Sequence, residues 1–443
     1  MATQGSPDGY TPQSPMYRKV ILAMVGAGLA SFNALYCTQA LLPVLSEDLH
    51  VTPATASLTV SATTGMLALS IIPASVISER FGRKRVIMLS ALSATLLGLL
   101  LPLSTSVGML IILRGLQGIA VAGVPATAMA YLSEEIHPKH VPQVMGLYVA
   151  GTSVGGLTGR VIPAGVLEFA SWRWALAATV AVAIIFAFIT SWALPDQQRF
   201  QPKRLTFRSE FSAIAQHVKD LRLSALFTLA FLLMGAFVSL YDYVGYRLTE
   251  HFGLSEGVAG AIFFLYLSGT WSATQAGVMV QKFGRARVLV GSIIGMMIGM
   301  AVMFSPELIS STLGILLFTA CFFSAHSVAS GWVGVVATAN RAEASSMYLF
   351  SYYMGSSIVG WLSGRVLHSW EWDGLVVWLL AGLAMAAVIA LFIARTTPSA
   401  RATPSPAGEP RSESRAVAVR GFIQVLLVLV FSEVHRFRRC IAQ

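Results

Sequence analysis

The sequence predicts an all-α membrane protein with twelve transmembrane helices in two pseudo-symmetric six-helix bundles. Of its 443 residues, 55% are hydrophobic and only 11% are charged, whereas about a quarter of the residues of a typical soluble domain are charged. A basic turn, ERFGRKR at Glu79–Arg85, returns as QKFGRAR at Gln281–Arg287. Long apolar runs flank both copies, so we expect lipid to surround the helices of a tandem repeat.

Apolar runs long enough to cross a bilayer recur along the chain, and many are rich in Gly, Ala and Ser, as close helix packing in lipid requires. They predict helices at residues 20–44, 55–78, 86–105, 109–132, 143–167, 174–194, 222–246, 258–280, 288–305, 311–337, 344–367 and 374–395.

The positive residues predict the orientation of these spans. Arg18 and Lys19 precede the first run, which is long enough to act as its own insertion signal, and most of the 30 Lys and Arg residues alternate onto the same side. The other side holds Arg173 and Arg247. Because positive loops stay in the cytoplasm, we expect a multi-pass protein of the inner (plasma) membrane with both termini and both basic turns cytoplasmic.

A polar, basic stretch divides the chain into halves. The predicted parts are an N-terminal tail at 1–17, a six-helix bundle at 18–194, a linker at 195–221, a second bundle at 222–395 and a cytoplasmic tail at 396–443. We expect the tail to be largely disordered, and its apolar segment at 421–431 is either an interfacial helix or a poorly ordered extension. GTSVGGLTGR at 151–160 resembles GSSIVGWLSGR at 355–365, and two similar halves favour alternating access about a central site.

Residues 18–395 resemble the major facilitator superfamily. In that family the turn after the second helix reads roughly G-x-x-x-D-R-x-G-R-R/K. Here Ser75 replaces the first glycine and Glu79 replaces the aspartate, while the other positions match at Arg80, Gly82, Arg83 and Lys84. The second copy has Gly277, Gln281, Gly284 and Arg285. The fourth span, with Arg114, Gln117 and Gly118, is similar to the family's R-x-x-Q-G motif.

The resemblance implies a cytoplasmic gate at the basic turns. In one state Glu79 would bond Arg83 or the N-terminus of a neighbouring helix, and in the other state it would release its partner; a carboxylate is stabilised at a helix N-terminus. The alternative is a turn that only sets topology. Because Gln281 stands where the second acid would be, we expect the gate to be stronger in the N-terminal half.

Three arginines lie inside predicted spans, where a charge is costly and usually functional. By resemblance, Arg114 faces the cavity and couples protons or contacts substrate; alternatively, it extends to the outer headgroups. Arg160 and Arg365 occupy equivalent places in the two halves. They either pair across the outer closure, bind an anionic group of the substrate, or bond backbone carbonyls at helix ends.

The remaining polar candidates lie in spans one, seven and ten. Asp242 is either a proton-coupling carboxylate or a wet residue of the outer aromatic belt. His326 is either a proton relay or a neutral histidine bonded to the next helix. Span one offers Gln39 but no acid; its Asn33 and Tyr36 share a helix face and could touch substrate.

The sequence indicates a transporter rather than an enzyme. It has no phosphate-binding loop, no cluster with metal-ligand spacing and no aromatic-interleaved basic stripe, so we expect no cofactor, no metal and no nucleic acid. We expect a monomer that exchanges protons for a small, fairly apolar organic solute or drug, most simply outward. The antiporter branch often has Gly-Pro in its fifth helix where this chain has Gly155-Gly156, so proton-coupled uptake stays open, as does a non-transporting sensor on this fold.

Overall fold

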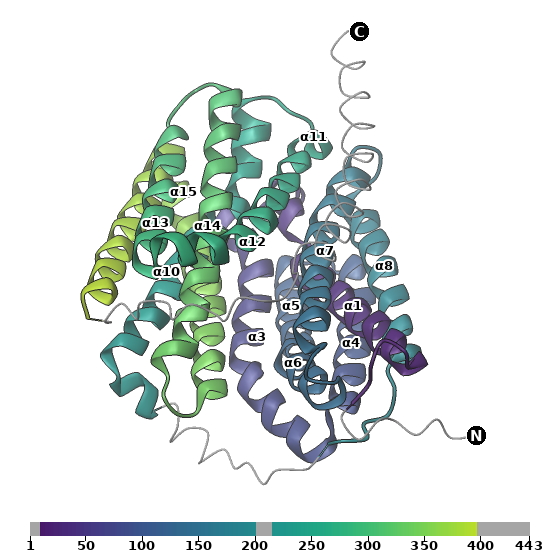
Figure 1. The fold of residues 1–443 in the computed structure, drawn as a ribbon. Helices are drawn as coiled ribbons and strands as arrows, with labels where there is room; N and C mark the ends of the chain where they lie inside the picture. The colour runs from purple at the N-terminus through teal and green to yellow at the C-terminus, as the bar shows by residue number, and fades with distance from the viewer. Residues whose placement is uncertain (1–8, 201–214, 397–443) are drawn as a thin grey trace. The chain divides into compact units, whose positions relative to one another are not determined.

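The computed structural model describes residues 9–200 and 215–396, and these residues belong to one compact unit, Met1–Pro398. Apart from an isolated bridge between Tyr10 and Ile136, the described residues are helical or loop (Figure 1). The N-terminal half contains α1 (Pro15–Tyr36), η1 (Gln39–Leu41), α2 (Leu42–Asp48), α3 (Pro53–Phe81), α4 (Arg83–Leu100), η2 (Leu101–Leu103), α5 (Val107–Val121), α6 (Gly123–Glu135), α7 (Val141–Leu167) and α8 (Trp172–Ala193).

The second half contains α10 (Leu221–Tyr246), η3 (Arg247–His251), α11 (Glu256–Gly260), η4 (Ala261–Leu265), α12 (Tyr266–Phe283), α13 (Arg285–Val302), α14 (Leu308–Val336) and α15 (Arg341–Thr396). Most residues of each of the twelve predicted ranges are helical. Within the described residues, nine stretches are long and apolar enough to cross a membrane by length and composition. The tail beyond residue 396 and the middle of the linker lie outside the described residues.

Two predicted spans differ from single regular helices. The fourth is divided at Ala122 into α5 and α6, and the eighth begins with α11 and a 3-10 turn before α12. The last two spans form one continuous helical stretch, α15, whose backbone leaves helical geometry at Glu371 (φ 56°, ψ −164°). This left-handed φ turns the chain between the two spans, and it is an uncommon conformation for a residue with a side chain.

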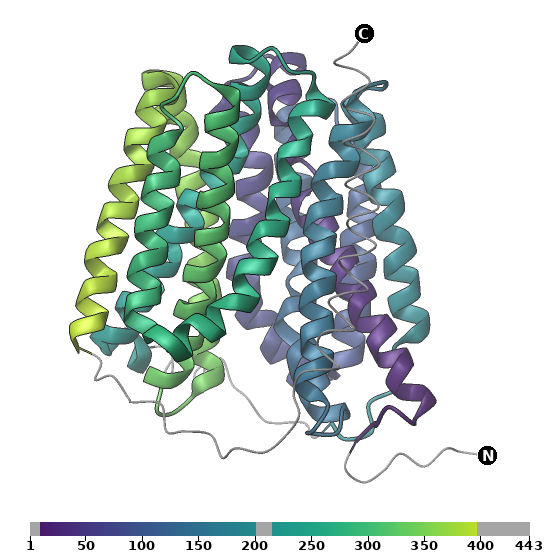
Figure 2. The ribbon, with the colours of Figure 1, turned by 45° about the horizontal axis from the view of Figure 1, so that its top comes forward.

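The same helix pairs form in both halves. In the first half α1 packs along α7 and α3 along α5; in the second half α10 packs along α15 and α12 along α14. Helices of the two halves also pack against each other in pairs: α3 packs along α15, and α7 packs along α11 (Figures 1 and 2). Spans one, two, four and five therefore repeat their packing in spans seven, eight, ten and eleven, as the sequence repeat predicts.

Two glycines make the paired contacts close. Gly151 on α7 faces the backbone of Val25 on α1, and Gly355 on α15 faces the backbone of Phe231 on α10. A Cβ atom at either glycine would collide with the facing main chain. The matched pairs show that small residues set the helix spacing, as is typical in membranes.

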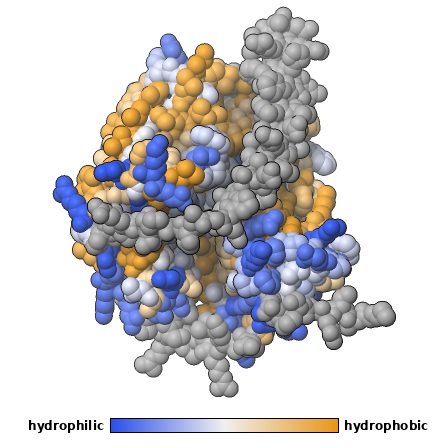
Figure 3. Space-filling view, in the orientation of Figure 1, coloured by the Kyte–Doolittle hydropathy of each residue, from blue (hydrophilic) through white to orange (hydrophobic). Residues whose placement is uncertain are grey.

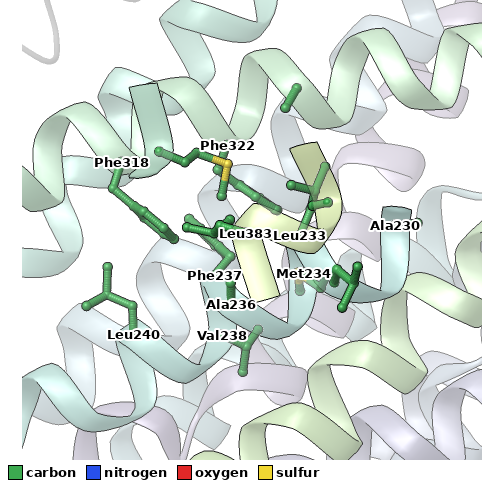
Figure 4. Close-up of a cluster of buried hydrophobic side chains, with 14 of the residues drawn as sticks. Ala230, Leu233, Met234, Ala236, Phe237, Val238, Leu240, Phe318, Phe322 and Leu383 are labelled. Atoms are coloured by element: carbon green, nitrogen blue, oxygen red, sulfur yellow. The ribbon is translucent and has the colours of Figure 1, made fainter. Parts of the chain in front are cut away.

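The second half is built around aromatic and aliphatic side chains of α10, α14 and α15 (Figure 4). Phe237 stacks on Phe322 with ring centroids 3.8 Å apart and lies parallel to Phe318 at 6.3 Å. Outward-facing positions are apolar too, with Trp192, Ile309 and Val388 at least 66% exposed (Figure 3). A helical surface this apolar requires lipid around it.

Candidate functional site

A polar network joins the two halves where α1 ends. Gln39, in η1, donates from Nε2 to Asp242 Oδ1 of α10 at 2.6 Å, and Gln39 Oε1 accepts from Arg160 Nε of α7 at 2.5 Å. All three residues are at most 2% exposed. Asp242 Oδ2 has no hydrogen-bond partner among the described residues. The amide of Gln39 therefore lies between a buried carboxylate and a buried guanidinium from opposite halves.

Aromatic rings from both halves surround the Arg160 end of this network. The guanidinium carbon lies 3.8 Å from the ring centroid of Tyr36 on α1 and 4.5 Å from that of Tyr266 on α12, and Phe263 follows at 5.8 Å. Such distances are within cation–π range. The second donor of Arg160, Nη1, bonds the carbonyl of Gly156 at 2.6 Å. Of the predicted site residues, Tyr36, Arg160 and Asp242 thus come together.

The two halves are bonded to each other towards the end opposite the basic turns. Ser46 bonds Tyr246 at 2.6 Å, and Glu168 accepts from Ser255 Oγ and from the backbone N–H groups at the start of α11. Within residues 9–200 and 215–396, the side-chain hydrogen bonds that link the halves all lie in this portion of the bundle. This opposite end is closed.

A cavity of about 550 Å³ opens on the opposite end, and its lining includes the carboxylates of Glu47, Glu250 and Glu256. Pro43 and Glu256 also line a constriction of about 10 Å³ that reaches Gln39. A space that small holds about one water at most. Glu256 therefore stands where the open cavity narrows towards the buried network, and burial together with Glu47 and Glu168 raises its pKa to about 7.

We expect Glu256 to make thermal stability depend on pH. Its pKa is above the ordinary 4.5, so its stabilising contribution is complete below about pH 4.5 and is lost as the pH rises through about 7. Melting curves of the native protein and of Glu256→Gln between about pH 5 and pH 8 should show a steeper decline for the native protein, by about 2 °C. Glu250→Gln, in the same cavity, is the control, and equal slopes in all three proteins would contradict the assignment.

The N-terminal basic turn contains two ion pairs that share Arg83. Arg83 donates to Glu79 at 2.5 Å, to Glu134 of α6 at 3.0 Å and to Ser78 at 2.6 Å. Glu79 and Arg83 are buried, and Gly82 takes a φ of 91° that favours glycine. In this state the predicted gate pair is made within the N-terminal half.

The turn also holds the beginning of the linker. Lys84 pairs with Asp196 at 2.8 Å through its side chain, and its backbone N–H donates to Gln197. The C-terminal turn differs, because Gln281 and Gly284 are exposed, as is Gly277, and no side-chain bond of Gln281 or Arg285 is found in the described part of the chain. The exposed Arg80 also makes no ion pair there. The two copies thus share a shape and differ in their ion pairs.

We expect Glu79→Ala and Arg83→Ala to reduce transport about tenfold without preventing membrane insertion. The first leaves Arg83 with Glu134 as its one carboxylate partner, and the second leaves the buried Glu79 without its partner. Gln281→Ala and Arg285→Ala are the matched controls at the exposed copy and should stay within about twofold. The measurement is substrate flux normalised to the amount of inserted protein. Native flux in both N-terminal variants would remove the gate hypothesis.

Arg114 has surroundings that differ from both predicted ones. It is 0% exposed, so it faces neither an open cavity nor the headgroups. Its guanidinium donates to the carbonyls of Ala34 and Leu35 in the last turn of α1, to that of Thr59 on α3, and to Gln117. Carbonyls at a helix C-terminus lack partners within the helix, so Arg114 caps α1 and ties it to α3 and α5.

The other candidates lie apart from the network. Asn33 is buried against α7, where its amide donates to Thr158 at 3.2 Å. His326 lies 3.0 Å from the Tyr348 hydroxyl and packs its ring against Tyr352. Arg365 is exposed and lies over Trp361, so the equivalence of Arg365 and Arg160 in sequence does not extend to their surroundings.

The bridging role of Gln39, the ring of Tyr266 and the contact of Glu134 with Arg83 were not predicted from the sequence. Gln39 carries a signal, a polar side chain at the end of an apolar span, but its partners come from two other helices. Within the described residues, no group of His, Cys, Asp and Glu that could hold a metal ion is found.

Two repeated helix bundles with an apolar outer surface and a buried polar network between them define a multi-pass membrane transporter. The family model of the Major Facilitator Superfamily matches residues 24–273 and 244–435, and the chain belongs to that family. The chain is 42% identical to the inner membrane transport protein YnfM of Escherichia coli over 86% of its own length and 90% of that protein. It is 36% identical to the uncharacterized MFS-type transporter YybF of Bacillus subtilis, over 86% of this chain and 95% of that protein.

Solved structures share the fold at low identity. A bacterial homologue of the human lysosomal transporter Spinster, in an inward-facing and unoccupied conformation, matches with a TM-score of 0.71 and 17% identity, covering 89% of this chain and all of the other. A D-xylose-proton symporter matches with a TM-score of 0.69 and 16% identity, covering 88% of this chain and all of the other. The family and the fold together establish secondary transport as the activity class.

Proposed function

We propose that the chain exports a small organic solute in exchange for protons, and that Asp242 carries the proton. The observation that supports this most directly is the bond between Asp242 and Gln39, because it joins a buried carboxylate of one half to the other half. Rocking of the halves must break that bond. Proton binding weakens it as well, because a hydrogen bond to an ionised carboxylate is about twice as strong as a neutral one.

The cycle follows from these contacts. With Asp242 ionised, Gln39 is held and the opposite end is closed. With Asp242 protonated, the link through Gln39 to Arg160 weakens and the closure loses a charge-assisted bond. The pairs at Ser46 and Glu168 are the remaining polar contacts that must separate. One carboxylate thereby connects proton occupancy to the side on which the site opens.

We place the chain in the inner membrane as a monomer, with both termini and the basic end in the cytoplasm. In that orientation the cavity beside Glu256 faces outward and the present state is closed to the outside. The basic turns and the linker support this placement through the positive-inside rule. Labelling of single cysteines at the N-terminal tail and at Phe169 with a membrane-impermeant reagent in intact cells tests it; labelling of the tail would overturn the orientation.

Vesicles containing the purified protein test the coupling and the direction. An imposed pH gradient should drive accumulation of a transported solute from the less acidic to the more acidic compartment if protons and solute exchange. Accumulation in the less acidic compartment would instead indicate uptake with protons. Flux that does not depend on the pH gradient would contradict proton coupling and would indicate a facilitated transporter.

A further inference from the structure

The buried guanidinium of Arg160 has no carboxylate within ion-pair distance among the described residues. Its Nε is bonded to Gln39 and its Nη1 to Gly156, both through neutral oxygens. Within residues 9–200 and 215–396, Arg160 has no hydrogen bond to a carboxylate, and its neighbours besides these two oxygens are aromatic rings. A positive charge held in the spanning region is costly unless a negative group balances it.

A hydroxyl next to Arg160 lacks a hydrogen-bond partner. The hydroxyl of Tyr266 is buried and has no hydrogen-bond partner in the described part of the chain, and the ring that bears it lies 4.5 Å from the guanidinium carbon. Leaving a buried donor unpaired is energetically costly. An unpaired hydroxyl on a ring beside a guanidinium that has no carboxylate partner is complementary to a carboxylate, which accepts several hydrogen bonds.

The aromatic rings around Arg160 favour a ligand that has an apolar or aromatic part. Tyr36 belongs to the first half, and Phe263 and Tyr266 belong to the second. An apolar or aromatic group placed among them would touch both halves at once. Asp242 does not compete for the guanidinium directly, because the Gln39 amide separates the two charges.

We propose that the solute is an organic anion, an aromatic or apolar carboxylate whose carboxylate binds Arg160 and the Tyr266 hydroxyl. The proposal rests on the proposed transport function and names the substrate class of the same site. Arg160 is then the residue that selects for negative charge. The carboxylate of Asp242 then binds the proton and takes no part in binding the solute.

Binding of three phenyl probes of similar size and different charge tests the inference: phenylacetate, phenylacetamide and phenethylamine. The full-length protein in lipid nanodiscs is titrated with each, and protection from thermal unfolding is measured. We expect the acid to bind at least about tenfold more tightly than the amide or the amine. An amine or amide that binds as well as the acid, or an acid without detectable binding, overturns the inference.

Variants test whether the preference for the acid arises at Arg160 and Tyr266. Arg160→Gln should remove the acid's advantage, Arg160→Lys should keep part of it, and Tyr266→Phe should reduce it about threefold. Arg365→Gln, at the repeat-related and exposed position, should leave it unchanged. A preference that survives both Arg160→Gln and Tyr266→Phe contradicts the assignment. Vesicle flux separates the two proposals: acid binding without proton-driven flux refutes the proposed coupling alone, and proton-driven flux of a cation refutes the anion alone.

Discussion

Asp242→Asn should lower proton-driven transport at least tenfold while leaving exchange of solute across the membrane in place. Asparagine has the shape of aspartate, and its carbonyl can accept the same bond from Gln39 that now measures 2.6 Å. The variant therefore keeps the contact between halves but cannot bind or release a proton. Flux in vesicles with and without a pH gradient measures both activities in one preparation.

A matched control is Asp373→Asn, an exposed aspartate in the same half, which should transport as the native protein does. Gln39→Leu is a second test, since it removes the amide that links Asp242 to Arg160 and leaves Asp242 buried without its hydrogen-bond donor. We expect it to impair both coupling and exchange. Full gradient-driven accumulation by Asp242→Asn would show that another group carries the proton.

Arg114→Met should cause the largest loss of stability of any single change considered. The methionine fills much of the space but removes the donor that now serves the carbonyls of Ala34 and Leu35 and the side-chain oxygen of Gln117. At about 1–3 kcal/mol for each buried group left unpaired, we expect a loss of roughly 3 kcal/mol or more. Thermal unfolding in detergent, followed by fluorescence, measures it.

Arg114→Lys should recover part of the loss, because one ammonium cannot reach carbonyls on two helices in the way a planar guanidinium does. Arg173→Met is the control, an arginine of the same half whose side chain is 44% exposed, and it should change stability by no more than about 0.5 kcal/mol. A stable Arg114→Met protein that has lost only proton-driven flux would instead make Arg114 a coupling residue.

The places of the long helices could be predicted from the sequence because lipid imposes one rule. Every span must be a long apolar helix, so a hydropathy reading finds it. The repeat of residues 151–160 at 355–365 likewise appears in the structure as the matched packing of Gly151 and Gly355. The break at Ala122, inside a predicted span, could not be predicted, since it depends on local geometry rather than composition; the turn at Glu371 lies between the predicted spans 344–367 and 374–395.

Single residues of the site could be predicted from the sequence, but the contacts between them could not. Asp242, Arg160 and Tyr36 stand out as polar groups in apolar spans, but which of them meet depends on how α1, α7 and α10 rotate about their axes. Arg160 and Arg365 show the limit most clearly. They follow the same glycine in the two repeats, yet one is buried under aromatic rings and the other is exposed. Glu168 bonds the start of α11 in the other half, a contact that depends on how the two halves pack.

Distances between spin labels at the two ends of the bundle test the central claim, that protonation of Asp242 changes which end is closed. One pair is Phe169 with His251 at the opposite end, and the other is Phe81 with Phe283 on the repeated basic turns; all four residues are exposed. Between about pH 8 and about pH 5 in nanodiscs, we expect the first distance to lengthen and the second to shorten, and Asp242→Asn to abolish both changes. Distances that stay fixed, or that change in the same direction at both ends, would contradict proton-coupled alternating access.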